Sequence, residues 1–309
     1  PLVASVPVND TTNGQYLGLP ILVFDVNAQN DTLHLRSVTV KIYDTAGGTG
    51  SVGAAYLFQG STQIASASVS SDTATFSNIS NGTAGATIPV NTTLPYTVKV
   101  DVTGVTSGTL GLTAGVATST TGDLTILSSN DSTGTISGSA AGNTQTVAAT
   151  GPLFTLVGTP TITKTNTTAG AGTLSVFDYT ATFNVNILAV GQNVLIGLPA
   201  STTVALGASF GTTSTGISLA QVYENGVAST TPISGGLIAT YSQPSNTTLA
   251  SNTFQVSRNQ NVTVPVTYSF TVINPGSAKY AVQIQGVYSS GSATTNFMAN
   301  QPAWRTASI

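Results

Sequence analysis

The chain has 309 residues, enough for two domains of ordinary size. Only 6% of the residues are charged, with seven Lys and Arg against ten Asp and Glu, whereas about 25% is usual for a soluble protein. Cysteine is absent and histidine occurs once. This composition therefore excludes three classes of protein. They are nucleic-acid binders with clustered cations, proteins with thiolate or multi-histidine metal sites, and scaffolds held by disulfides.

The surface must consist mostly of neutral polar residues. Ser and Thr together number 88, and Asn numbers 21. Apolar residues make up 40% of the chain and the mean hydropathy is +0.25, so large cores can form and disorder is excluded. No apolar run approaches the ~18 residues of a membrane helix, so we expect no membrane span.

Alternation with a period of two residues dominates the chain, and helix-forming Glu, Lys and Arg are scarce. Taken in chain order, apolar residues alternate with polar ones in residues 33–42, 96–103 and 262–270. Clusters of Gly, Asn, Asp and Ser interrupt these runs, as in β-sandwiches. We therefore predict an all-β chain with under ~10% helix, against the usual ~30–35%.

Short motifs recur in the same order in the two halves of the chain. The matching pairs are Val23–Asp25 with Val176–Asp178, Ala55–Gly60 with Gln221–Gly226, Thr87–Val90 with Thr263–Val266, Tyr96–Val102 with Tyr268–Val272, and Leu110–Val116 with Tyr280–Val287. This repeat predicts two Ig-like antiparallel β-sandwich domains in tandem, residues 1–150 and 151–309, joined around residues 146–153. The first domain would begin with an extended N-terminal segment.

Residues that could catalyse a reaction are few. His34 lies within an alternating run, which favours a polar residue on the outer face of a strand over a general base. Asp25 and Asp178 occupy equivalent positions of the repeat, which favours a shared structural role such as capping a turn. Three Asn-Asp pairs offer oxygen ligands for calcium but lack EF-hand spacing. We predict no enzyme activity, no cofactor and no metal site.

Sequons for N-glycosylation, Asn-x-Ser/Thr, are slightly more frequent than the about six expected from 21 Asn in a chain this rich in Ser and Thr. They occur at nine positions: Asn9, Asn30, Asn78, Asn81, Asn91, Asn130, Asn166, Asn246 and Asn261. Composition alone is the alternative explanation. Covalent glycans would supply the solubilising layer that the missing charges do not, and would place the protein outside the cell.

Several segments resemble a known group of proteins: Leu22–Asp25, Leu35–Ile42, Ala55–Ser61, Ala86–Val102, Ser132–Ile136 and Tyr280–Ile284. They resemble Thr/Ser-rich, Ig-like β-sandwich repeats of cell-surface proteins from prokaryotes, bacterial or archaeal, of the candidate phyla. In composition and architecture the chain is also similar to subunits of archaeal extracellular threads and bundling pili. That resemblance implies a glycosylated subunit that polymerises by donating a strand. The long N-terminal helix of archaeal type IV pilins is missing.

These features predict a structural subunit of an extracellular filament, a pilus-like or thread-like fibre whose partner is a second copy of the chain. An open sheet edge pairs with an extended segment, and a head-to-tail contact that does not close yields a fibre. Two alternatives stay open. One is a surface-layer lattice or stalk protein. The other is an adhesin or carbohydrate-binding module, although the single tryptophan, Trp304, offers little aromatic platform.

The predicted donor strand is the N-terminal segment, residues 1–9. Every second residue of this segment is apolar, namely Leu2, Ala4, Val6 and Val8. These residues form an apolar face that so short a segment cannot bury alone. The alternative is an ordinary first strand of the first domain. The C-terminal stretch 297–309 is the second candidate donor.

Overall fold

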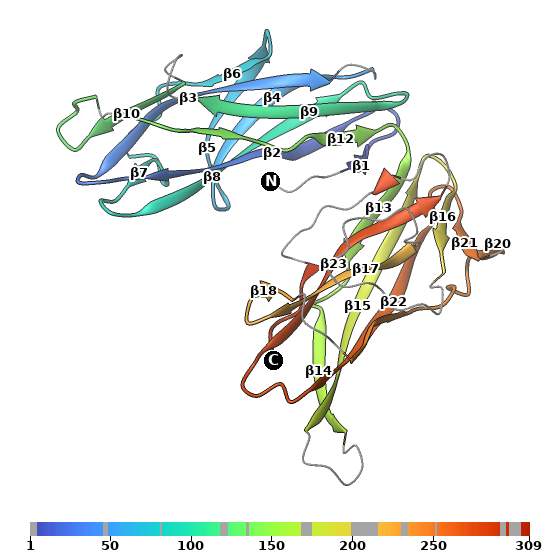
Figure 1. Cartoon of the computed structure of the whole chain (residues 1–309). Coiled ribbons are helices and arrows are strands. Elements are labelled where there is room, and N and C mark those ends of the chain that lie inside the picture. Colours follow the sequence, from blue (N-terminus) through green and yellow to red (C-terminus); the bar gives the residue numbers. More distant parts are fainter. Residues whose placement is uncertain are drawn as a thin grey trace. The chain divides into compact units, whose positions relative to one another are not determined.

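The structure is a computed structural model of the chain. It describes residues 5–45, 49–80, 82–117, 123–133, 136–167, 175–198, 216–229, 234–250, 252–290, 295–296 and 304–309. In these ranges the chain forms strands and turns without an α-helix, so the all-β prediction is confirmed there. The chain divides into two compact units, one holding Pro7–Ala149 and the other Thr150–Ile309 together with Ser5 and Val6 (Figure 1). The strand that contains Ser5 and Val6 is described with the first unit, because it belongs to the sheet of that unit. Each unit is described by itself.

The first unit is built from short and long strands in one continuous path. Its strands are β1 (Ser5–Pro7), β2 (Tyr16–Asn27), β3 (Leu33–Thr45), β4 (Ser51–Gln59), β5 (Thr62–Ser70), β6 (Thr73–Phe76), β7 (Thr87–Ile88), β8 (Thr93–Thr103), β9 (Thr109–Ala117), β10 (Leu124–Ser128), β11 (Ser139–Ala141) and β12 (Gln145–Ala148). The order along the path is β1-β12-β9-β3-β6-β5-β4-β8-β2, with β7 and β10 on β3 and β11 on β9.

Strand β5 joins the two halves of this path. Residues 62–68 of β5 pair with β4, whereas Val69 and Ser70 pair with β6. Both halves contribute to the interior, because Val38 and Val40 of β3 and Val98 and Val100 of β8 are fully buried. These residues stand at alternate positions, as the period-two pattern of the sequence predicts.

The second unit consists of two antiparallel sheets. Its strands are β13 (Gly151–Leu156), β14 (Thr161–Thr167), β15 (Val176–Val190), β16 (Val194–Gly197), β17 (Gly216–Glu224), β18 (Val227–Ala228), β19 (Ser234–Thr240), β20 (Thr248–Ala250), β21 (Thr253–Val256), β22 (Asn261–Ile273), β23 (Tyr280–Ser290) and β24 (Thr295–Asn296). One sheet has the order β13-β15-β22-β19, with β14 also on β15. The other has the order β18-β17-β23-β16-β21-β20, with β24 on β23.

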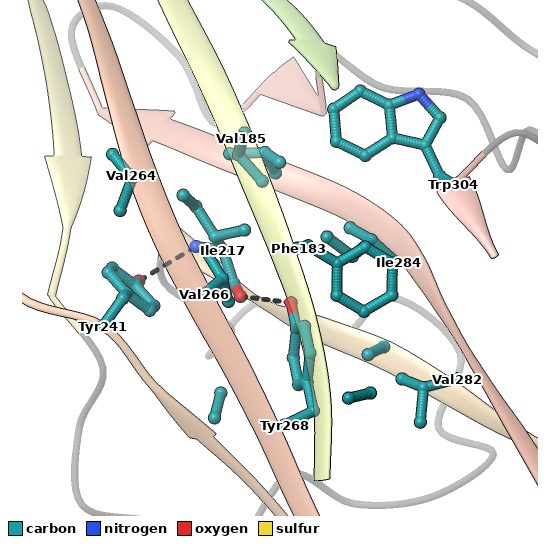
Figure 2. Packing of buried hydrophobic residues seen from close by; sticks show 14 of the residues in the cluster. Phe183, Val185, Ile217, Tyr241, Val264, Val266, Tyr268, Val282, Ile284 and Trp304 are labelled. Carbon is teal, nitrogen blue, oxygen red and sulfur yellow. Dashed lines mark hydrogen bonds between the residues drawn. The ribbon is translucent and has the colours of Figure 1, made fainter. Parts of the chain in front are cut away.

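The two sheets of the second unit pack face to face as a β-sandwich. One buried cluster takes Phe183 and Val185 from β15, Val266 from β22, and Val282 and Ile284 from β23 (Figure 2). The burial of β22 alternates strictly along its length, which is what its sequence predicts for residues 262–270. Burying each such aliphatic side chain stabilises the fold by ~1.5–3 kcal/mol.

The two units share part of their pairing scheme. The first long strand pairs with the penultimate one in each, β2 with β8 and β15 with β22, and β3–β9 corresponds to β16–β23. The hairpin strand differs, because β4 pairs with β8 whereas β17 pairs with β23. Thr87–Val90 includes the short strand β7, but Thr263–Val266 lies inside β22, so this pair of motifs does not correspond.

Buried tyrosine hydroxyls tie β17 to the rest of the second unit. Tyr268 Oη donates to the carbonyl oxygen of Ile217 at 2.6 Å, and the N–H of Ile217 donates to Tyr241 Oη at 2.9 Å (Figure 2). Burial raises the pKa of Tyr268 well above its ordinary value. By contrast, Tyr179 Oη is buried and has no hydrogen-bond partner in the part of the chain that the structure describes.

This difference gives a matched pair of substitutions. Tyr268→Phe should lower the free energy of unfolding by ~1–3 kcal/mol, because the buried carbonyl of Ile217 loses its donor. Tyr179→Phe removes a hydroxyl that makes no bond, so it should leave stability unchanged or raise it. Urea denaturation of both variants measures the effect. Equal destabilisation by the two substitutions would contradict the hydrogen bonding described here.

Candidate functional site

The described part of the predicted donor segment is paired within its own chain. β1 is the end strand of the 12-stranded sheet, beside β12, and the N–H of Val8 donates to the carbonyl oxygen of Ala148 at 2.8 Å. Val6 is half-buried and Val8 is fully buried. Leu2 and Ala4 lie outside the described residues. Strand donation to a second copy and the alternative of an ordinary first strand both stay predictions.

The described end of the second candidate donor also pairs with its own sheet. The N–H and carbonyl of Ile309 bond to Tyr280 at 3.1 and 2.8 Å, and the N–H of Thr306 donates to Val282 at 2.9 Å. Trp304 is 5% exposed and belongs to the core cluster that also contains Phe183 and Ile284 (Figure 2). The single tryptophan therefore serves the core of this unit and not an aromatic platform on the surface.

The residues considered for catalysis stand apart from one another. His34 is half-buried in β3, where its Nδ1 lies 3.1 Å from Thr87 Oγ1. Asp25 is exposed on β2 opposite Pro95 of β8. Within the described ranges, no three His, Asp or Glu side chains gather as they would around a metal ion.

Asp178 lies within β15 and connects three neighbouring strands. Its Oδ1 accepts a hydrogen bond from Thr271 of β22 at 2.6 Å, and its Oδ2 accepts one from Thr167 of β14 at 2.8 Å. These hydroxyls lower the pKa of Asp178, with Thr271 contributing most. We call such a set of side chains bonded across three strands a rung. Asp178 is therefore a cross-strand residue and not the turn cap that its place in the repeat suggested.

A second rung, made only of neutral groups, crosses the same sheet at Asn186. Asn186 Nδ2 donates to Thr155 of β13 at 3.2 Å, and Thr263 of β22 donates to Asn186 Oδ1 at 3.3 Å. Both rungs lie on the outer face, because the odd-numbered residues 179–187 of β15 fill the core. The sequence pattern locates this outer face but does not show which of its residues bond.

Two of the three Asn-Asp pairs weighed for calcium use their carboxylates in local structure. Asp31 Oδ2 accepts from the N–H and hydroxyl of Ser129 at 3.1 and 2.9 Å. Asp10 accepts from the carboxamide of Asn13 at 2.8 Å and from the N–H of Thr12 at 2.9 Å. The side-chain bond from Ser129 lowers the pKa of Asp31, and the one from Asn13 lowers that of Asp10.

The outer face of β4 and β8 carries aromatic residues that the sequence analysis missed. Tyr56 and Phe58 point away from the buried Ala55 and Leu57. Tyr56 Oη donates to Asp101 Oδ2 at 2.6 Å, and Lys99 Nζ lies 4.3 Å from the centroid of the Phe58 ring. Because residues 54–58 are all apolar, alternation of residue type could not reveal which of them face outward.

The sequon asparagines lie on the surface. Eight of the nine fall within the described residues, and all eight are exposed: Asn9, Asn30, Asn78, Asn91, Asn130, Asn166, Asn246 and Asn261. Asn81 lies outside the described residues. Asn30, Asn78 and Asn91 have positive φ angles of 68°, 56° and 56°, which Asn tolerates better than most residues.

Neither models of known protein families nor curated proteins match the chain. Within the described ranges, no helix is present that is long and apolar enough to cross a membrane. Function is therefore inferred from the residues and contacts described above.

The lowered pKa values of Asp10, Asp31 and Asp178 predict a loss of stability in acid. A carboxylate whose pKa is lowered by folding stabilises the fold above its unfolded pKa, about 3.9 for Asp. The stabilisation disappears as the pH falls through the folded pKa. The urea midpoint should therefore be level from pH 7 to pH 5 and fall below about pH 4. Asp178→Asn should show a smaller fall. A wild-type midpoint that stays level down to pH 2 would contradict this prediction.

Proposed function

We propose that the chain is a structural subunit of an extracellular filament, a homopolymer built from two tandem Ig-like β-sandwich domains, residues 1–150 and 151–309. The observation that carries this proposal is the use of outer-face polar groups as rungs. Asn186 and Asp178 each join three strands of one sheet, so these side chains resist sliding of one strand past another. Such cross-strand ties support a mechanical role better than a chemical one.

Strand exchange between copies is the proposed mode of assembly. β1 is a short edge strand that pairs with β12, and edge strands are templates for pairing with another chain. The contacts of Val8 and Ala148 within one chain are those that a donated segment would make with its neighbour after exchange. Exchange of an identical element costs little, because the same contacts form in both states.

An adhesin or carbohydrate-binding module is the second candidate function. The aromatic side chains of Tyr56 and Phe58, with Lys99 and Asp101 beside them, support this candidate. Aromatic rings next to hydrogen-bonding groups suit the mixed apolar and polar faces of a sugar. Loss of binding to cell-surface polysaccharide in Phe58→Ala, with unchanged binding in a control such as Thr125→Ala, an exposed residue of β10, would favour this function.

Electron microscopy of the negatively stained full chain tests the filament proposal. We expect fibres from the full chain, and folded but unpolymerised subunits from a variant lacking residues 1–8. The reason is that the truncated chain keeps all of its core except Val8 and cannot offer Val6 and Val8 to a neighbour. Circular dichroism of the same sample checks that the subunits are folded.

Three other results have distinct meanings. Filaments of normal length from the truncated chain would contradict the N-terminal donor. The C-terminal residues 304–309 would then be the candidate donor, and a variant that lacks them would test this. A wholly unfolded truncated product would favour β1 as an ordinary strand of its own unit. Flat lattices or single subunits from the full chain would contradict the filament.

A further inference from the structure

The asparagines of this chain fall into two groups that differ in what their carboxamides do. At least seven of the described asparagines outside sequons use the carboxamide in a hydrogen bond: Asn13, Asn27, Asn186, Asn193, Asn225, Asn259 and Asn274. These bonds stabilise turns or join strands. The carboxamide oxygen of Asn193, for example, accepts the N–H of Arg258 at 2.8 Å.

The sequon asparagines behave differently. In the part of the chain that the structure describes, none of the eight makes a hydrogen bond through its carboxamide, and all eight are exposed. Exposure alone does not explain the contrast, because Asn13, Asn225 and Asn274 are exposed as well and do form such bonds.

Composition cannot explain the contrast either. If sequons arose only because Ser and Thr are abundant, they would fall on bonded and unbonded asparagines alike. Among the described asparagines outside sequons, the seven named above use their carboxamides in hydrogen bonds, whereas the carboxamides of Asn184 and Asn252 make none. The sequons instead coincide with carboxamides that have no structural task and whose nitrogen is open to reaction.

Three of these open carboxamides lie in loops that are bonded together at one end of the first unit. Asn30 follows β2, Asn91 precedes β8 and Asn130 follows β10. The N–H of Asn91 donates to Ala28 at 2.8 Å, and Ser129 donates twice to Asp31. The loops that carry these three asparagines are far apart in sequence, with Asn30 and Asn130 100 residues apart. They meet at the end of the unit where β7 and β10 lie (Figure 1).

We infer that the described sequon asparagines are attachment sites for N-linked oligosaccharides, and that Asn30, Asn91 and Asn130 form a sugar-covered end of the first unit. This inference rests on the proposed function for its extracellular location. In each transfer, Asn Nδ2 forms a bond to the anomeric carbon of a diphosphate-activated oligosaccharide. The bond from that carbon to the diphosphate breaks, and one amide proton passes to a base of the transferase.

Glycans at these positions have a consequence for assembly. Bulky hydrophilic chains on three adjoining loops keep another protein surface from packing there. The subunit contacts of the proposed filament therefore avoid this end of the first unit. β1 and β12 themselves contain no sequon, and the nearest one, at Asn9, follows β1 by two residues.

Glycopeptide mass spectrometry of the protein purified from the cells that make it tests the inference. Peptides with Asn30, Asn91 and Asn130 should carry sugar masses, and peptides with Asn186 or Asn225 should be bare. Bare peptides at all eight described sequons would overturn the inference. Microscopy of the same sample separates the two proposals: bare filaments would refute only the glycans, and glycosylated single subunits would refute only the filament.

Variants of the Asn130 sequon provide the controls. In the full chain secreted from a eukaryotic cell that glycosylates sequons, Ser132→Ala should abolish the sugar at Asn130, and Ser132→Thr should keep it. In unglycosylated protein, Asn130→Gln should leave the urea midpoint unchanged, whereas Asn186→Gln should lower it. Equal losses from these two substitutions would show that Asn130 has a structural task, and would overturn its assignment as an open carboxamide.

Discussion

A slip of one residue along any long strand of this protein would turn its buried apolar row toward solvent. β22 buries Val264, Val266 and Tyr268 and leaves the residues between them outside, and its partner β15 does the same. Register is therefore fixed by burial, and fixed register is what brings distant polar side chains into line. The rungs at Asp178 and Asn186 exist only because the inner faces hold three strands in place.

The sequence predicts the faces of the long strands well and their lateral contacts poorly. Alternation of apolar and polar residues in 96–102 and 262–270 was sufficient to predict which side chains are buried, because a half-buried strand imposes a period of two on its residues. The rungs could not be predicted, since Asp178 and Thr271 lie 93 residues apart and no motif marks them. The same limit applies to β1: its residues alternate visibly, but nothing in residues 145–148 identifies them as its partner.

The pairing of β2 with β8 corresponds to that of β15 with β22, but Val23–Asp25 lies near the end of β2, whereas Val176–Asp178 begins β15. Each motif lies on a strand that pairs with a long strand near the end of its unit. The motifs around Pro89 and Pro265 are similar in sequence but not in structure. Pro89 accepts from Thr92 in a turn, whereas Pro265 stands inside β22 opposite Asn184. Similar short motifs in the two halves therefore do not by themselves mark the same place in the fold.

The neutral rung at Asn186 also bears on the solutions in which the protein can work. Dissolved ions screen charge pairs, with a screening length of ~10 Å at 0.1 M salt and ~3 Å at 1 M. A bond between a carboxamide and a threonine hydroxyl has no net charge to screen, and apolar burial does not weaken as salt is added. Sheets joined in this way keep their lateral cohesion from fresh water to brine, where a surface built on lysine and glutamate pairs would lose much of its own.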